Sequence, residues 1–433
     1  MKIESPPKFK SDYSKYFESI KKVDCLSFIH ETDSNYWFWS ELKRRPDIPF
    51  RSPKTTWEII KLHRSISAKH LTLGEHSFHY NITSSIQKEL HLFDLKLIGG
   101  LYKDSISPQD QEEYFKTSLI EEAIASSQIE GAATTTRVAL ELLKTGRRPR
   151  NESEQMILNN YAAIREITTR LKEPLGVQLI IDIHELMTSN TDASRYAGNF
   201  RDHPIYVKDL ITGDIAFTAP KFPEVNGLVE QLLVFINNED DFIHPILKAS
   251  ILHFLIGYIH PFGDGNGRTA RALYYWFLIK KGYSLLRHIS ISKAILESRT
   301  SYDKAFLYTE LDQNDLTYFI IYSMKSLRVA FQNLVDYRDK KRDQRMKATK
   351  FMSILIDKGF SKRQSELLGF LLLKPNSMIT ITDYSKRHDI VRQTASRDLT
   401  ELEDKGLLIK TKDGKSLSYQ LSDIEKLKKL VKH

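Results

Sequence analysis

The chain has 433 residues, of which 41% are hydrophobic and 27% charged, and its formal net charge is +9. This length suits about three domains of roughly 150 residues each, and the composition is ordinary for a globular protein. No apolar run approaches the roughly 18 residues of a membrane span, and the N-terminus lacks the apolar segment of a signal peptide. The lone cysteine, Cys25, excludes an internal disulfide. We expect a cytoplasmic protein without a membrane partner, whose charge permits nucleic-acid binding without establishing it.

The first three quarters of the chain are expected to be mainly helical. Residues 1–115 predict amphipathic helices from about Trp57 onward and carry no recognisable chemistry. From about residue 116 the apolar residues recur at helical spacing. The exception is the stretch 198–220, where two short β-type runs flank Thr212-Gly213-Asp214 and predict a β-hairpin.

Residues 336–433 are expected to form a separate unit after a long polar helix. The basic cluster within residues 339–350 is interpreted as a solvated helix face or linker. Ser361 is a plausible N-cap for a helix that runs to Leu373, and helices are expected near 382–387 and 392–405, the last ended by Gly406. Two alternating strands follow around Asp413-Gly414. A helix, a helix-turn-helix and a β-wing in this order predict a winged helix.

Residues 260–271 read His-Pro-Phe-Gly-Asp-Gly-Asn-Gly-Arg-Thr-Ala-Arg. The apolar helix before them must end near His260, because Pro261 disfavours helical geometry in the residue that precedes it. The glycine-rich loop can direct backbone N–H groups at an anion where the next helix starts. Arg268 and Arg271 share a face of that helix and repel each other near its positive end. The arrangement therefore predicts a bound anion such as a polyphosphate.

Asp264 in this loop offers a hard carboxylate oxygen, which suits a Mg²⁺ that keeps most of its waters and bridges phosphates. A calcium loop fits poorly, because Arg268 takes the next ligand position and Tyr275 the acidic twelfth one. A Walker loop is excluded, since GxxxxGK[ST] is absent. A purely structural turn would not need a histidine, an aspartate and two arginines at these spacings.

The segment resembles the Fic family signature HPFx[D/E]GNGRxxR at all nine specified positions. The resemblance implies a helical enzyme that transfers AMP from ATP to a Ser, Thr or Tyr hydroxyl of a target protein. His260, near its usual pKa, would be the general base, and Asp264 would hold Mg²⁺ against the α- and β-phosphates. Arg268 would contact the inner phosphates and Arg271 the γ-phosphate. The implied ATP-binding residues are Gly263, Asp264, Gly265, Asn266, Gly267, Arg268 and Arg271.

Two further segments extend the resemblance. Residues 126–131 resemble the family's inhibitory motif [ST]xxxE[GN], with Ser126, Glu130 and Gly131 at its specified positions, although such residues are often plain surface residues of a helix. The hairpin at 201–218 resembles the flap that docks the target as an added strand. Its docking residues would be Tyr206, Val207 and Phe217, and a plain structural hairpin is the alternative. His184 and His253 are interpreted as packed core histidines.

The expected fold is mainly α: a Fic-type helical core with a small β-hairpin flap, plus a C-terminal winged helix-turn-helix domain. The expected domains are an N-terminal associated region (1–115), a catalytic core with its inhibitory helix (116–335), and a linker helix with the winged helix (336–433).

Three functions remain open. The first is an autoinhibited protein adenylyltransferase that also modifies itself, and the second is the same fold with other transfer chemistry or AMP removal. The third is a DNA-binding regulator that senses nucleotide, and retention of His260 argues against a purely sensory role. A protein contact is the alternative for the winged helix, and the oligomeric state, a homo-oligomer included, stays open. Candidate contacts to duplex DNA are Arg392, Gln393, Thr394, Ser396 and Arg397.

Overall fold

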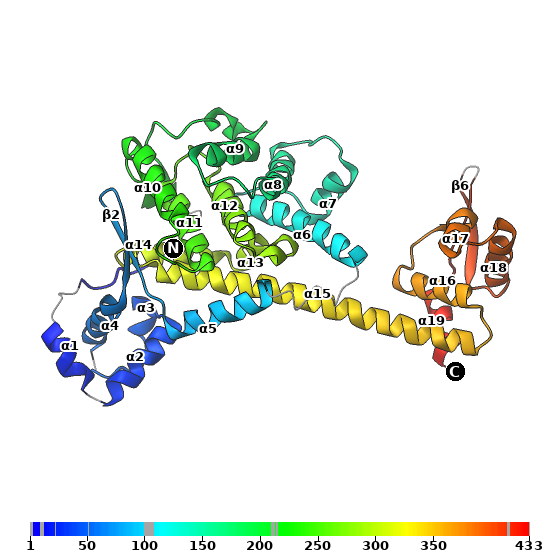
Figure 1. The fold of residues 1–433 in the computed structure, drawn as a ribbon, viewed down its shortest axis with the longest axis horizontal. Coiled ribbons are helices and arrows are strands. Elements are labelled where there is room, and N and C mark those ends of the chain that lie inside the picture. Colours follow the sequence, from blue (N-terminus) through cyan, green and yellow to red (C-terminus); the bar gives the residue numbers. More distant parts are fainter. Residues whose placement is uncertain are drawn as a thin grey trace. The chain divides into compact units, whose positions relative to one another are not determined.

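The computed structural model describes residues 3–8, 13–21, 23–50, 52–98, 108–208, 213, 215–413 and 416–432. Within these ranges the chain is mainly helical, as predicted, and its strands form three small antiparallel sheets (Figure 1). The chain divides into two compact units, residues 1–334 and residues 335–433.

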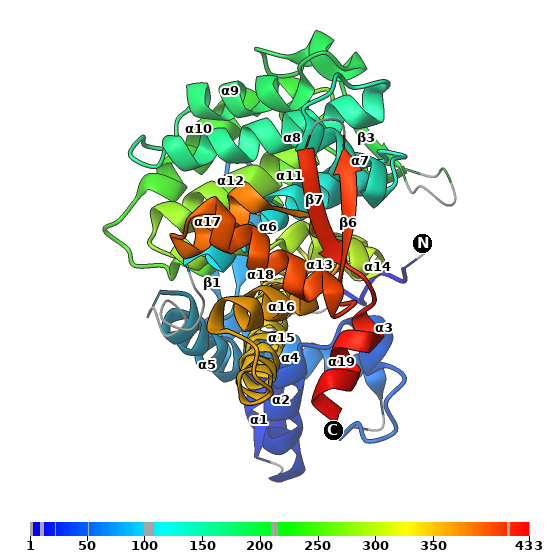
Figure 2. The same ribbon diagram turned by 90° about the vertical axis from the view of Figure 1, so that its right-hand side faces the viewer.

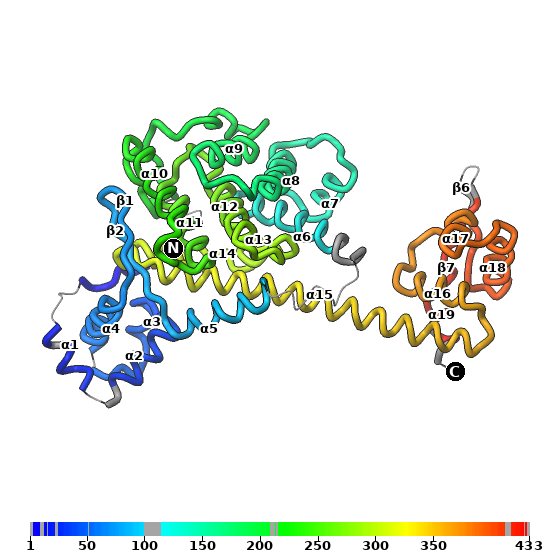
Figure 3. The backbone as a smooth tube through the Cα atoms, viewed as in Figure 1, coloured from blue at the N-terminus to red at the C-terminus, as the bar shows by residue number. Residues whose placement is uncertain are grey.

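The first unit holds most of the helices, and Figure 3 traces the chain through them by colour. They are α1 (Tyr13–Ile20), α2 (Val23–Asn35), α3 (Trp39–Leu42), α4 (Pro53–Ser67), α5 (Ser84–Phe93), α6 (Pro108–Ile129), α7 (Thr136–Thr145), α8 (Glu152–Thr169), α9 (Val177–Thr188), α10 (Val225–Asn237), α11 (Pro245–Ile259), α12 (Asn266–Lys280), α13 (Ile291–Glu297) and α14 (Arg299–Leu311). Shorter helical turns are η1 (Asp94–Ile98), η3 (Asp192–Tyr196), η4 (Phe222–Glu224) and η5 (Ser284–His288). The long helix α15 (Thr317–Asp357) begins in this unit and ends in the second.

The centre of the first unit is the pair α11 and α12, which pack side by side (Figure 1). Every side chain from Ile246 to Ile256 in α11 and from Arg268 to Ile279 in α12 is buried. A helix that is buried on all sides needs neighbours on all sides. Helices α6, α8 and α9 pack against α12, and α10 packs against α11. The loop between these two helices, residues 260–265, therefore connects two helices that are packed on all sides.

The N-terminal region contains a hairpin that the sequence did not predict. Strands β1 (Lys69–Leu73) and β2 (His76–Tyr80) pair antiparallel, and Gly74 takes a positive φ of 57° at the turn. Leu73, Phe78 and Tyr80 are buried, which gives the strands one apolar face. The expectation of helices alone for residues 1–115 was wrong here, because tertiary burial of that face decides the strand pairing.

Residues 1–115 and the following core are joined by buried contacts. The Lys61 ammonium lies 2.9 Å from Asp312 and 3.2 Å from Asp315, and Tyr36 donates to Asp315 at 2.8 Å. The boundary expected between 115 and 116 falls inside α6, so it does not separate the two. The boundary expected between 335 and 336 lies one residue from the observed division.

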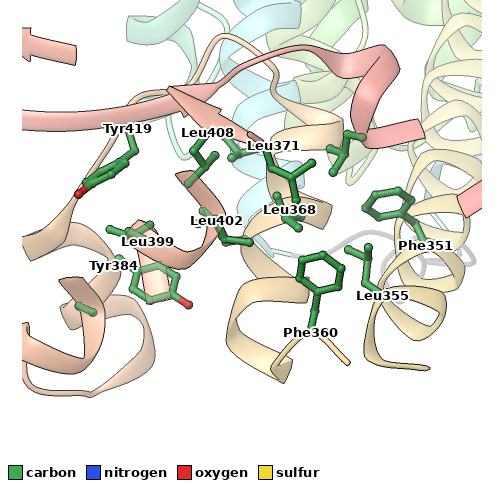
Figure 4. Close-up of a cluster of buried hydrophobic side chains, with 14 residues drawn as sticks. Phe351, Leu355, Phe360, Leu368, Leu371, Tyr384, Leu399, Leu402, Leu408 and Tyr419 are labelled. Carbon is green, nitrogen blue, oxygen red and sulfur yellow. The ribbon is translucent and has the colours of Figure 1, made fainter. Parts of the chain in front are cut away.

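The second unit follows α15 as α16 (Lys362–Leu373), β5 (Ile379–Thr380), α17 (Ile381–His388), α18 (Arg392–Asp404), β6 (Leu408–Asp413), β7 (Ser416–Leu421) and α19 (Ile424–Lys432). Ser361 caps α16, as predicted, and the sheet order is β5–β7–β6, with β6 and β7 visible side by side in Figure 2. The sequence missed β5 and α19. The core, whose side chains are drawn in Figure 4, consists of Phe351, Leu355, Phe360, Leu367, Leu368, Leu371, Tyr384, Ala395, Leu399, Leu402, Leu407, Leu408, Tyr419 and Leu427.

Candidate functional site

His260 ends α11 and faces a cavity. Its backbone N–H closes the helix on Ile256, and its φ of 51° is left-handed, a region in which histidine is several-fold enriched among non-glycine residues. The ring nitrogen Nδ1 lies 3.0 Å from the carbonyl of Gly257. A carbonyl only accepts, so Nδ1 carries the proton and Nε2 of the neutral ring is left as an acceptor. His260 thus has the tautomer that a general base requires.

Burial lowers the pKa of His260 below its ordinary value of 6.5, although the hydrogen bond to Gly257 and the charge of Glu130 act in the opposite direction. The expectation of an imidazole near its usual pKa was therefore wrong, because the ring loses its water. A pKa below 6.5 makes the neutral, proton-accepting ring the main form at pH 7.

An NMR titration of the His260 ring should give a midpoint below the ordinary value of 6.5. Replacing Glu130 by glycine should move the His260 midpoint lower still, since the carboxylate stabilises the imidazolium. A midpoint at or above 6.5 would show that the ring is not desolvated in solution.

Arg201 fixes the backbone around His260, and sequence reasoning missed it. Its Nε donates to the carbonyl of His260 at 2.7 Å, and its Nη2 donates to the carbonyls of Pro220 at 2.6 Å and Ile259 at 3.3 Å. The side chain is buried. Arg201 therefore ties the end of α11 to the base of the hairpin at 206–218. Its contacts to the His260 segment lie about sixty residues along the chain, so nothing in the local sequence marks it.

The loop after His260 is held in shape by its own side chains. Asn266 accepts from the N–H of Phe262 at 2.9 Å and donates to the carbonyl of Phe262 at 2.8 Å. Gly265, with a φ of 83°, donates its N–H to Asp264 Oδ1 at 2.5 Å. The amide of Asn266 and the N–H of Gly265 are thus used within the loop. The anion nest expected from residues 265–267 would therefore consist of the backbone N–H groups at the start of α12, which no side chain caps.

Two more residues shape this loop: His184, which the sequence predicted only as a packed core histidine, and Tyr196, which it did not single out. The His184 ring stacks on Phe262 at 3.6 Å, and its Nε2 donates to the carbonyl of Asp264 at 2.8 Å. Burial lowers the pKa of His184 to about 4, so the ring stays neutral. The Tyr196 ring lies against Gly263, where a Cβ would meet it at 2.4 Å. His184 and His253 are both buried, as predicted for packed histidines, and His253 contacts the Tyr302 hydroxyl at 3.0 Å.

Arg268 and Arg271 are buried to 98% but not fully satisfied. Arg268 donates to the carbonyl of Met187 at 2.9 Å and lies 3.8 Å from Asp264, while its Nε has no partner among the described residues. Arg271 Nη1 likewise has no partner in the part of the chain that the structure describes. Buried donors without acceptors cost free energy, so both guanidinium groups have capacity for an anion.

Glu130 and Ser126 meet Arg271, although 141 and 145 residues separate them from it. Arg271 Nη2 donates to Glu130 Oε1 at 2.9 Å and to the carbonyl of Ser126 at 2.9 Å, and Nε donates to the Ser126 hydroxyl at 3.0 Å. Burial raises the pKa of Glu130, but Arg271 and Arg268 lower it more, so its net shift is downward and the carboxylate stays charged. Gly131 follows with a φ of 95°, which lets the chain turn away after Glu130.

The Glu130 carboxylate lies directly over the start of α12. A Cβ added at Gly267 would come within 2.2 Å of Glu130 Oε1. Glu130 therefore occupies the space next to the free backbone N–H groups of this helix, where an anion would bind.

A cavity of about 270 Å³ lies beside Glu130 and Gly267. It is lined by Glu130, Gly267 and His260 on one side and by Val207 and Phe217 of the hairpin on another. Burial raises the pKa of a further lining residue, Glu310, to about 8, so its carboxyl is mostly protonated at pH 7 and can donate a hydrogen bond.

The predicted hairpin is present as β3 (Tyr206–Lys208) and β4 (Ile215–Thr218), with Val207 opposite Phe217. Phe217 and Val207 line the cavity, and the Phe217 ring lies 5.1 Å from that of Tyr258. Tyr206 points away, with 52% of it exposed. Of the expected turn, Thr212 and Asp214 lie outside the described residues.

A divalent cation would have Asp264 as its protein ligand. The Asp264 side chain is 57% exposed, and no group of three or more His, Cys, Asp or Glu in the described ranges could hold a metal. A single exposed carboxylate fits a cation such as Mg²⁺, which keeps several waters and takes further oxygens from phosphates.

The candidate DNA contacts lie on α18 in the second unit. Arg392, Gln393 and Arg397 are exposed, and Thr394 is half-buried. The ion pair of Arg397 with Glu401 is long, at 3.9 Å, and both side chains are exposed to solvent. The start of α18 therefore presents two cations and an amide to solvent.

Known proteins resemble this chain in sequence over part of its length. The protein adenylyltransferase Fic of Nematostella vectensis is 27% identical over 180 residues, which is 40% of this chain and 39% of the relative. The protein of the same name from Drosophila mojavensis is 31% identical over 133 residues, 29% of this chain and 24% of the relative. The chain thus matches less than half of the length of these curated relatives.

Solved structures show the fold. A Fic family protein from Desulfovibrio desulfuricans G20 aligns with a TM-score of 0.54 at 20% identity, over 79% of this chain and 97% of that one. Fic-1 from C. elegans aligns with a TM-score of 0.53 at 18% identity, over 72% of this chain and 84% of that one. The predicted mainly α core is confirmed.

No described helix is both long and apolar enough to cross a membrane. Residues 174–278, which include His260 and the loop after it, match the Fic/DOC family.

Proposed function

We propose that this chain is an autoinhibited protein adenylyltransferase, which transfers AMP from ATP to a Ser, Thr or Tyr hydroxyl of a target protein and of itself. The observation that carries the proposal is the cavity that His260, Gly267, Glu130 and two residues of the hairpin line together, with Glu130 paired to Arg271. The names of the matched relatives, which are protein adenylyltransferases, point to the same activity.

The reaction follows from the placement of these groups. The target hydroxyl oxygen attacks the α-phosphorus of ATP, and its proton moves to His260 Nε2. The bond between the α-phosphorus and the bridging oxygen breaks, and pyrophosphate leaves. Arg268, Arg271 and the start of α12 bind the phosphates. Asp264 would hold Mg²⁺, which would supply positive charge against the phosphate oxygens. The hairpin pairs with the target segment as an added strand.

The group that is transferred separates this proposal from other chemistry on the same fold. ATP labelled in its α-phosphate should leave label on protein, and ATP labelled in its γ-phosphate should leave none. Mass spectrometry of the modified protein should show an added AMP. Retention of the γ-label would instead indicate phosphate transfer, and loss of AMP from a pre-modified target would indicate the reverse reaction.

Replacing Asp264 by alanine should lower AMP transfer and remove its dependence on Mg²⁺, because the cation loses its protein ligand. The measurement is incorporation of labelled AMP over a Mg²⁺ titration. Asp202→Ala is the matched control, since the Asp202 side chain is 96% exposed and pairs with the adjacent His203. An unchanged Mg²⁺ dependence in Asp264→Ala would assign the cation to another site.

The second unit is a candidate DNA-binding module, proposed as a winged helix. Support comes from the order α16, α17, α18, β6 and β7 and from the exposed Arg392, Gln393 and Arg397 at the start of α18. The competing role is a protein contact.

The full chain should bind duplex DNA with an affinity that falls steeply with salt, and changing Arg392 and Arg397 to alanine should reduce the log–log salt slope by about 2. Changing the exposed Arg137 and Arg148 in the first unit alters net charge equally and serves as the control. Salt-independent binding, or none at low salt, would favour the protein contact.

A further inference from the structure

The inhibitory residues sit at the end of a helix that is firmly anchored elsewhere. Within α6 the buried carboxylate of Glu122 accepts from the Tyr275 hydroxyl at 2.7 Å, the Ser290 hydroxyl at 3.0 Å and the Ser292 N–H at 2.8 Å. Sliding α6 as a body would break this buried set, which is costly because it leaves a charge without partners. Movement of Glu130 must therefore arise in the last turn of α6.

Arg299, at the start of α14, forms a hydrogen bond to the backbone of that last turn. Arg299 Nη1 donates to the carbonyl of Ile129, the residue directly before Glu130. The carbonyls of a final helical turn have no partners within their own helix, so Arg299 satisfies one that would otherwise be open. Its side chain is only 34% exposed.

Asp303 braces Arg299 from one turn further along α14. Arg299 Nε lies 3.0 Å and 3.2 Å from the two carboxylate oxygens of Asp303. The pair is spaced i, i+4, which a helix holds without strain. Both residues line the cavity that also contains Glu130 and His260. Arg299 is thus oriented at both ends, by Asp303 and by the Ile129 carbonyl.

Glu130 is therefore held by two arginines from separate elements. Arg271 of α12 binds its carboxylate, and Arg299 of α14 binds the peptide that carries it. The charge of Arg299 also contributes, after those of Arg271 and Arg268, to the lowered pKa of Glu130. If Arg271 alone held Glu130, the carboxylate could move away together with the end of the helix. The bond from Arg299 to the Ile129 carbonyl also fixes the backbone next to Glu130.

We infer that Arg299, braced by Asp303, is a positioning residue that holds Glu130 over Gly267 and Arg271, so that loosening Arg299 weakens inhibition without removing the inhibitory carboxylate. The inference rests on the proposed inhibitory role of Glu130 for its effect on AMP transfer. Its structural part, the restraint of the last turn of α6, does not depend on that role.

The test measures two quantities on the full chain. Arg299→Ala should raise incorporation of labelled AMP by about three- to tenfold, the range expected for losing one hydrogen bond of typical net strength. In a Glu130→Gly background the same change should give no increase, because no inhibitory carboxylate remains to be positioned. Hydrogen exchange of the amides of residues 130–132, which bond back to Ser127 and Gln128, should become faster in Arg299→Ala.

Matched variants separate positioning from general damage. Arg299→Lys keeps a donor and should stay close to wild type, and Asp303→Asn should fall between the two. Arg328→Ala removes an exposed arginine that pairs with Glu89 and should change neither quantity. One outcome would reject the inhibitory role of Glu130 but keep the restraint of the last turn of α6 by Arg299. In it, Arg299→Ala exchanges faster but transfers no more AMP in either background, and Glu130→Gly is not activated. The inference would be overturned if hydrogen exchange in Arg299→Ala stayed unchanged. It would also be overturned if Arg299→Ala did not raise AMP transfer although Glu130→Gly did.

Discussion

Glu130→Gly should raise AMP incorporation into target and into the protein itself, by at least about tenfold. In the wild type the Glu130–Arg271 pair takes the positive charge that a γ-phosphate needs and fills the space over Gly267. We therefore expect ATP to bind the wild type with its α-phosphate out of line with the attacking hydroxyl. Alignment of reacting groups contributes up to ~7–11 kcal/mol in transfer reactions, so even partial misalignment costs a large factor in rate.

The measurement is incorporation of α-labelled AMP with Mg²⁺ by purified wild type and variant. Arg271→Ala should not reproduce the activation, because it removes the phosphate partner together with the inhibitory one. Glu121→Ala changes a half-buried acid of the same helix that pairs with Lys293, and it should leave the rate unchanged. A rate in Glu130→Gly equal to or below wild type would make Glu130 a structural residue or one that positions water for removing AMP.

The sequence predicted those parts of the site whose geometry is local. The end of α11 at His260 follows from Pro261, and the start of α12 follows from the glycine at 265, because both are decided within a few residues. The contact between Glu130 and Arg271 spans 141 residues and came only from the family resemblance. The structure places the two side chains in contact.

Residues that act through distant partners left no local pattern. Arg201, His184 and Arg299 each donate to a backbone carbonyl that lies 59 to 170 residues away. A carbonyl acceptor is present at every residue, so no particular residue type at the partner position reveals such a bond. The lowered pKa of His260 was missed for a related reason, since it depends on how completely other helices bury the ring.

His260→Ala should abolish most AMP transfer while ATP binding stays nearly intact. The comparison is best made in the Glu130→Gly background, where the parental rate is high enough to measure a large loss. Removal of a general base lowers rates by about 10²–10⁴-fold. Binding should survive because the phosphate-binding groups, Arg268, Arg271 and the start of α12, do not depend on the imidazole.

The backbone at His260 requires a second variant, because its φ of 51° is costly for most side chains and a folding defect could imitate a catalytic one. Asparagine tolerates this region better than alanine and cannot act as a base, so His260→Asn should lose activity with an unchanged thermal midpoint. His70→Ala removes an exposed histidine on β1 and should leave the rate unaltered. Labelling by either His260 variant at the parental rate would mean that the hydroxyl loses its proton to water or to the phosphate itself. His260 would then serve only to end α11 and close the loop against Gly257.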